Sequence, residues 1–127
     1  MPVDSLADSI REMRPFLPAK DFPVSKSFYA TLGFTVHDLG ADLAEVRFGE
    51  KAFLLQNFYV EEWANNFMMH LLVTDVDEWW KRLSALDLPS RFAVAAPKTP
   101  KLEPWGHRVC YLIDPSGVLW HISETVE

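Results

Sequence analysis

The sequence has little cysteine and no long apolar run. The single cysteine, Cys110, cannot form an internal disulfide, and this sparing use is typical of a reducing compartment. No apolar run approaches the roughly 20 residues that a membrane-spanning helix needs, and residues 1–13 lack the apolar centre of a signal peptide. These absences predict a cytoplasmic protein with no membrane partner. We expect Cys110 itself to be a buried, inert thiol, because no histidine partner is apparent beside it.

Basic residues are also scarce. Lysine and arginine number 12 against 18 acidic residues, which gives a formal net charge of −6, and they form no basic run. Such a surface repels the phosphate backbone, so no nucleic-acid partner is expected. Aromatic residues, by contrast, make up 13% of the chain. Large flat side chains fill cores, and they also line pockets for flat or apolar ligands.

The order of apolar and turn residues predicts one structural unit in the first half of the chain. A brief strand over 14–19 precedes a helix over 21–33, which begins at the N-cap Asp21 and ends at Gly33. Three β-rich runs separated by turn residues follow, at 34–40, 42–49 and 51–59. They predict an antiparallel meander.

The second half of the chain repeats this plan. The predicted elements are a strand over 67–73, a helix over 75–88, a strand over 91–97, a loop over 97–106, and a hairpin of 107–113 with 118–124 across the DPSG turn. The repeat predicts an α+β fold of two βαβββ modules, module one at 14–58 and module two at 67–124. We expect them to form a curved mixed sheet around a cleft, with the helices on the outer face. Residues 14–124 would make one domain after a helical extension at 1–13.

Alternation along the strands brings polar side chains onto the faces opposite the apolar ones. Arg14, Gln56, His70 and His121 are the polar residues on these faces. Their companions include Phe16, Leu54, Met68 and Leu72, where a solvent-facing strand would carry lysine, glutamate, serine or threonine. A mixture of apolar and convergent polar groups indicates a ligand cleft. The alternative is a second core in which the polar groups satisfy one another.

Four stretches carry a resemblance to a known family: KDFPVSKSFYATLGF, LLQN, VTDVDEWWKRL and WGHRVCYLIDPSGVLWHISE. They are similar to the glyoxalase/bleomycin resistance protein/dioxygenase group, the vicinal oxygen chelate superfamily. The resemblance extends over about 14–124. It implies paired βαβββ modules, and commonly a homodimer whose ligand clefts are built from both modules and often from both chains.

The resemblance also implies where catalytic members would hold a divalent metal. Matching the motifs places the four ligand positions at Arg14, Gln56, Met68 and His121. An arginine does not bind metal, and a thioether is a poor ligand among oxygen and nitrogen donors. The prediction is therefore a protein with no metal cofactor. The alternative is a site for Fe, Mn, Ni or Zn formed by Gln56, His70 and His121.

Loss of the metal ligands favours a binding protein that resembles the bleomycin-resistance branch, with a small, aromatic or drug-like molecule and a second copy of the chain as its partners. The predicted ligand-binding residues are Arg14, Phe16, Gln56, Trp63, Met68, His70, Trp105, His107 and His121. The arginine weakens the case for a cationic ligand. The alternative function is a metal-dependent lyase or dioxygenase, for which no catalytic residue is identified. A third possibility is a dimerisation or regulatory module without a ligand.

Overall fold

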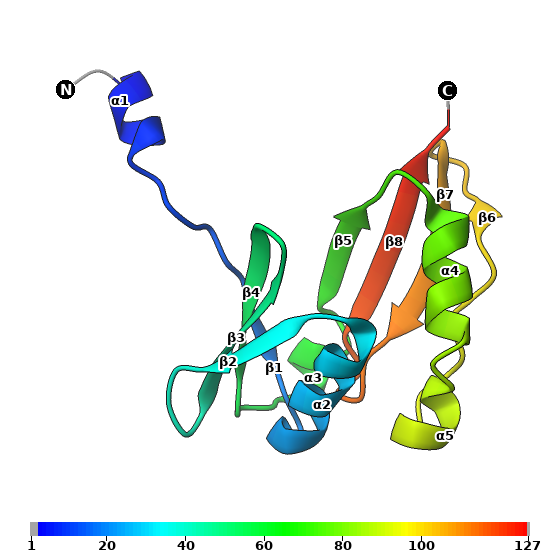
Figure 1. Ribbon diagram of the computed structural model, residues 1–127, viewed down its shortest axis with the longest axis horizontal. Helices are drawn as coiled ribbons and strands as arrows, with labels where there is room; N and C mark the ends of the chain where they lie inside the picture. The colour runs from blue at the N-terminus through cyan, green and yellow to red at the C-terminus, as the bar shows by residue number, and fades with distance from the viewer. Residues whose placement is uncertain (1–2, 127) are drawn as a thin grey trace.

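The computed structural model describes residues 3–126, with side chains from Leu6 onward (Figure 1). The predicted extension over 1–13 contains a short helix, α1 (Val3–Asp8), and then a segment without regular structure; its first two residues lie outside the described range. In Figure 1 this segment projects away from the rest of the chain. Its apolar side chains Ile10 and Met13 are exposed. Within residues 3–126, no helix is both long enough and apolar enough to cross a membrane.

Module one is a βαβββ unit, as predicted. Its elements are β1 (Phe16–Pro18), α2 (Phe22–Leu32), β2 (Thr35–Asp38), β3 (Leu43–Phe48) and β4 (Lys51–Gln56). The strand order is β1-β4-β3-β2, with β1 parallel to β4 and the other pairs antiparallel. Helix α2 begins where the Asp21 carboxylate accepts from Val24 N at 3.2 Å. It ends at Gly33, whose φ of 112° is a conformation that residues with a Cβ rarely adopt.

Module two repeats this arrangement after a connecting helical turn, α3 (Glu61–Ala64). Its elements are β5 (Met68–Leu72), α4 (Val76–Ser84), α5 (Leu88–Phe92), β6 (Lys101–Leu102), β7 (His107–Ile113) and β8 (Leu119–Thr125). The strand order is β5-β8-β7-β6, with β5 parallel to β8. The α+β fold of two βαβββ modules is therefore confirmed.

The predicted strand over 91–97 is wrong. Helix α5 includes the first two of these residues, with Pro89 in its first turn, where the missing N–H breaks no helical hydrogen bond. The helix stops at Ala93, whose φ is 55°. The strand that pairs with β7 is β6, only two residues long. A short apolar run such as RFAVAAP does not distinguish helix from strand by periodicity alone.

The faces of the two sheets that pack against the helices meet in one core; we call these the inner faces. The rings of Phe53 on β4 and Trp120 on β8 lie 5.6 Å apart, and Tyr29 of α2 contacts both. The Tyr29 hydroxyl donates to Asp114 Oδ2 at 2.6 Å and accepts from Trp120 Nε1 at 3.0 Å. Because Asp114 begins the turn between β7 and β8, this contact joins the helix of one module to the hairpin of the other.

The opposite, outer faces of the two sheets point away from each other. Among the described residues the strands form two separate four-stranded sheets rather than one continuous sheet (Figure 1). Their inner faces share the core that contains Phe53 and Trp120, so each outer face lies on the far side of its own sheet. The helices pack against the inner faces, which are the sides predicted to carry them, turned away from the polar faces. Within a single chain the two outer faces do not enclose a common cleft.

Candidate functional site

The outer face of the module-two sheet carries a cluster of rings, and we call it the histidine face. Strand pairing places His121 of β8 between His70 of β5 and Tyr111 of β7. The Tyr111 and His121 rings are 4.9 Å apart in an edge-on arrangement, and the His70 and His107 rings stack at 5.8 Å. Ser123 follows on the same face. Sequence reasoning named the three histidines but missed Tyr111, although alternation from His107 places it on this face.

Two polar atoms on the histidine face have no partner. Among the described residues, the buried side-chain atoms without a hydrogen bond are His121 Nε2 and Ser123 Oγ. Burial is the main cause that lowers the pKa of His121, and the charge of a protonated His70 lowers it further, while Glu103 acts in the opposite direction. The imidazole is therefore neutral around pH 7 and offers one donor and one acceptor. Buried polar atoms are nearly always hydrogen-bonded, so this pair marks a position where a water molecule or a ligand atom would supply the missing partner.

Apolar side chains border these polar atoms. Met68 and Leu72 lie on the same face of β5 and expose 62% and 56% of their surface. They are the first and last residues of β5, the edge strand of this sheet, where little of the chain packs over their side chains. Polar atoms without partners beside exposed apolar side chains are the combination that a small-molecule site presents.

The outer face of the module-one sheet is different, and we call it the ion-pair face. Arg14 and Arg47 both form ion pairs with Glu45, and Arg47 also pairs with Glu12. The hydrogen bond from Arg47 is the main cause that lowers the pKa of Glu45, and Arg14 adds to it. The charges on this face therefore balance. Arg14, predicted to contact a ligand, already has an acidic partner in the chain.

Glu45 and Arg47 were missed at the sequence level. Both lie on β3, where Leu43, Glu45 and Arg47 alternate with the inner residues Ala44 and Val46. The same alternation that identified Gln56 on β4 would have placed them on the outer face. The pairing itself was not visible in the sequence, because Arg14 and Glu45 are separated by 31 positions.

The predicted ligand-binding residues divide between these two faces. Those on the histidine face are Met68, His70, His107 and His121. Those beside or on the ion-pair face are Arg14, Phe16 and Gln56. Trp63 of α3 and Trp105 of the β6–β7 turn are both exposed, and the Trp63 ring lies 6.1 Å from that of Phe58. One chain therefore does not bring Arg14 and Gln56 to His70 and His121.

The comparison with known proteins decides the family. The model of the glyoxalase/bleomycin resistance protein/dioxygenase superfamily matches residues 8–122. The chain belongs to this superfamily. No curated protein matches it by sequence.

Solved structures of the superfamily have the same fold. A bleomycin-binding protein in complex with bleomycin is 22% identical with a TM-score of 0.76, and the match covers 92% of this chain and 100% of that one. The bleomycin-binding protein of Streptomyces verticillus, with copper(II)-bleomycin, is 25% identical with a TM-score of 0.74, over 92% and 99% of the two chains. A lactoylglutathione lyase from Agrobacterium tumefaciens is 19% identical with a TM-score of 0.65, over 91% and 94%. The fold thus occurs in proteins with different activities.

The metal ligands of the superfamily's enzymes are not reproduced within one chain. In the part of the chain that the structure describes, no three histidine, cysteine, aspartate or glutamate side chains lie where they could hold a metal ion. Gln56 lies on the opposite outer face from His70 and His121. At a further ligand position of the superfamily, the Arg14 guanidinium pairs with Glu45. These residues of a single chain do not fit a metal centre.

Cys110 is confirmed as a buried thiol. It lies on the inner face of β7 and is fully buried. Burial raises its pKa to about 11, which keeps the thiol protonated and poorly nucleophilic near neutral pH.

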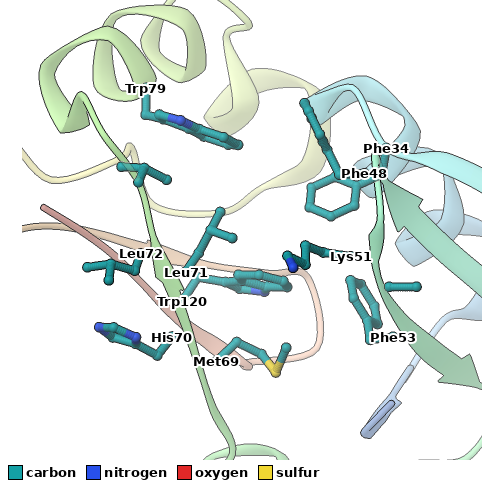
Figure 2. Close-up of a pocket in the computed structure, with 12 residues that line it drawn as sticks. Phe34, Phe48, Lys51, Phe53, Met69, His70, Leu71, Leu72, Trp79 and Trp120 are labelled. Atoms are coloured by element: carbon teal, nitrogen blue, oxygen red, sulfur yellow. The ribbon is translucent and has the colours of Figure 1, made fainter. Parts of the chain in front are cut away.

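The structure also contains a cavity that sequence reasoning missed. A space of about 500 Å³ lies between the inner faces of the two sheets, beside α4 (Figure 2). Its aromatic lining consists of Phe34, Phe48, Phe53, Trp79 and Trp120. Sequence reasoning gave the apolar faces of these strands to the core. Alternation shows which side chains share a face, but not where two inner faces fail to meet.

Proposed function

We propose that the protein binds a flat, drug-like small molecule at the histidine face, without a metal cofactor, and sequesters it. The observation that carries this proposal is the pair of unpartnered buried atoms, His121 Nε2 and Ser123 Oγ. Leaving a buried polar atom unbonded costs about 1–3 kcal/mol, and a ligand that bonds to both atoms would remove that cost. The neighbouring rings and apolar side chains would then contact the ligand's planar surface.

The ligand we propose is neutral or weakly cationic. The centre of the histidine face carries the His121 imidazole, neutral near pH 7, and the Tyr111 hydroxyl, and Glu103 is close enough to affect the pKa of His121. A fixed anion on the ligand would gain no ion pair from these groups near neutral pH. A planar ring system with a donor and an acceptor matches His121 and Ser123 best.

A second copy of the chain would complete the site. The two outer faces point in opposite directions, and each exposes large apolar side chains: Phe16 is 50% exposed and Met68 is 62% exposed. In a twofold dimer the ion-pair face of each copy can cover the histidine face of the other, which yields two equivalent clefts. This arrangement would bring Arg14 and Gln56 of one copy opposite His70 and His121 of the second copy, as the resemblance implied and as one chain cannot.

The solved structures support a binding role without establishing it. Two of them are bleomycin-binding proteins, and each matches nearly the whole chain. The lactoylglutathione lyase has the same fold, so the fold alone does not separate binding from catalysis. The balance of Arg14 with Glu45 favours binding, because it leaves an ion pair at a position where the superfamily's enzymes hold a metal.

Tryptophan fluorescence tests the binding proposal. We expect copper(II)-bleomycin or a member of a panel of planar aromatic compounds to quench the fluorescence saturably. The variant His121→Ala should weaken this binding at least about tenfold, since it removes a buried hydrogen-bonding group. Ser84→Ala, at the exposed end of α4 and away from both outer faces, is the control and should bind as the wild type does. If no compound gives saturable quenching, the proposal is wrong.

Sedimentation equilibrium tests the dimer separately. We expect the wild type to have twice the mass of the chain, and Met68→Glu to be monomeric, because it would place a charge inside the interface between copies. Lys81→Glu, which introduces a carboxylate on the exposed side of α4 and away from both outer faces, should remain dimeric. A wild type that is monomeric at every concentration would contradict the dimer.

Metal analysis separates binding from the enzymatic alternative. Protein purified without a chelator should contain no stoichiometric Fe, Mn, Ni or Zn. A stoichiometric metal that is lost in His121→Ala would show instead that two copies assemble the site from Gln56, His70 and His121. That result would favour a lyase or a dioxygenase over sequestration.

A further inference from the structure

We propose that the cavity between the inner faces of the two sheets is a second binding site, for a small aromatic anion, with Lys51 as its charge partner. This site differs from the histidine face, because its walls are mainly the inner faces of both modules and α4, and the two sites share only the edge of β5 at His70 and Leu72. Its volume of about 500 Å³ falls within the range of about 300–1,000 Å³ that is usual for ligand pockets.

The cavity runs from an open mouth to a buried floor. At the mouth, Phe48 is 43% exposed and Lys51 is exposed, on either side of the β3–β4 turn. At the floor, Phe53 and Trp120 are almost fully buried. The rings of Phe48 and Trp79 lie 5.7 Å apart and border the space together, and Figure 2 shows the Trp120 indole on another side of it. A planar molecule that enters at the mouth would therefore lie among aromatic rings on several sides.

Packing of the hydrophobic core does not explain why a charged residue, Lys51, lies on this inner face. Alternation along β4 places it on the same inner face as Phe53 and Leu55, where every other side chain is apolar. It is the only lining residue with a permanent charge, and in Figure 2 its side chain extends into the cavity. Among the described residues no carboxylate forms an ion pair with it. An ammonium group at the mouth of an aromatic cavity selects a ligand with an acidic group.

The edge of β5 adds backbone hydrogen-bonding groups to the same cavity. Leu119 N donates to Phe67 O and Val73 N donates to Ser123 O, so the odd-numbered residues of this segment bond to β8. Backbone groups alternate along a strand, and the N–H and C=O of His70 and Leu72 therefore point to the free edge. Both residues line the cavity. A carboxylate or sulfonate with an adjacent polar group can thus bond to Lys51 while the rest of the molecule reaches β5.

The net charge of −6 does not oppose such a ligand. The charges on the ion-pair face are balanced, Glu78 next to Trp79 is paired with Arg82, and Glu50, the carboxylate that directly precedes Lys51, is not among the residues that line the cavity. Exposed charges beyond about 10 Å are largely screened at physiological ionic strength. The local charge at the cavity is therefore the positive one of Lys51.

Two fluorescent probes of similar shape test the charge requirement. Anilinonaphthalene sulfonate is an aromatic anion, and N-phenyl-naphthylamine is its neutral analogue. In Lys51→Met the apolar stem remains and the charge is lost, so we expect the dissociation constant of the anion to rise about tenfold, while that of the neutral probe stays unchanged. Lys101→Met, which removes an exposed lysine distant from the cavity, should bind both probes as the wild type does.

The tryptophan indole signals in a nitrogen–proton correlation spectrum report where the anion binds. After assignment with single Trp→Phe variants, we expect the anion to shift the signals of Trp79 and Trp120 and to leave Trp63 and Trp105 in place. Unshifted Trp79 and Trp120 signals, or equal weakening of both probes in Lys51→Met, would overturn the proposal. Because His121→Ala should not alter these shifts, the second site and the histidine-face site succeed or fail independently.

Discussion

The two modules share one scaffold but have opposite surface chemistry. Each has an edge strand parallel to its neighbour, a helix that starts at an aspartate N-cap and an antiparallel meander. On the outer face of module one, Arg14, Glu45 and Arg47 satisfy one another. On the outer face of module two, His121 and Ser123 have buried atoms without partners. The two modules therefore share a backbone pattern but differ in their outward-facing side chains. Those of module one form ion pairs with one another, whereas those of module two include polar atoms without a hydrogen-bond partner.

The modules also depend on each other, and removal of Asp114 should reveal this most strongly. Its buried carboxylate accepts from Tyr29 Oη at 2.6 Å, Ser116 N at 2.8 Å and Val118 N at 2.9 Å. We expect Asp114→Ala to lower the free energy of unfolding by about 3 kcal/mol or more, because it leaves these donors buried without partners. Urea denaturation measures this. Asp42→Ala, which loses one exposed hydrogen bond from Asn57, should change the stability far less.

The two main helices end differently, and glycine exchange should show it. Helix α2 ends at Gly33 with φ of 112°, whereas α4 ends at Ala85 with φ of −71°. A Cβ on Gly33 would be strained and would lie 3.3 Å from Phe48 Cε2, so Gly33→Ala should cost about 1–2 kcal/mol of stability. Ala85→Gly should cost only about 0.5–1 kcal/mol, through the entropy of the unfolded chain. Equal losses in thermal unfolding would contradict this difference.

The contribution of the ion-pair face to stability should depend on the salt concentration, whereas that of the histidine face should not. Glu45→Gln leaves Arg14 and Arg47 without their shared carboxylate. We expect it to lower the free energy of unfolding by less than Asp114→Ala or Gly33→Ala does. The loss should shrink in high salt, because screening weakens both the lost attraction and the new repulsion. Urea midpoints at low and high salt provide the measurement. Glu78→Gln, in an exposed pair within α4, is the control and should have little effect at either salt concentration.

The histidine face should respond to acid. Burial lowers the pKa of His121 below its usual 6.5, so the unfolded chain binds a proton more tightly than the folded one. Stability is therefore highest above pH 6.5 and decreases as the pH falls through the lowered pKa. A proton titration by NMR should give the low value directly, and His121→Phe should reduce the loss of stability in acid. If His37→Phe on module one reduces it as much, the assignment to His121 is wrong.

Much of the fold followed from local patterns. Asp21 and Gly33 marked the limits of α2 because a side-chain acceptor and a positive φ are local requirements. The alternation that put Phe53 and Trp120 on inner faces was also correct, since the side-chain period of a strand does not depend on its neighbours. The residues 91–97 failed for the opposite reason. Residues 91–97 would form a strand only if they paired with the edge of β7. Contacts between residues far apart in the sequence decide which segment pairs there.

The site was predictable only in part. Its histidines were found because they interrupt apolar strands. The pairing of Glu45 with Arg14 was missed because the two residues lie far apart in the chain. The separation of the two outer faces was not predictable by alternation, which fixes the sides of each sheet but not how two sheets are placed. The cavity beside Lys51 depends on the same placement.

The contact of Tyr29 with Asp114 has a consequence for how such a chain can evolve. A tyrosine in the first copy of the repeat is held by an aspartate in the second, and Trp120 of the second copy bonds to the same hydroxyl. Replacement or removal of either module would therefore leave a buried polar group of the other module without its hydrogen-bond partner. The outward strand positions carry no such mutual dependence. They are free to accumulate substitutions, so new ligand specificities can arise there while the hydroxyl, carboxylate and indole at the centre stay under joint selection.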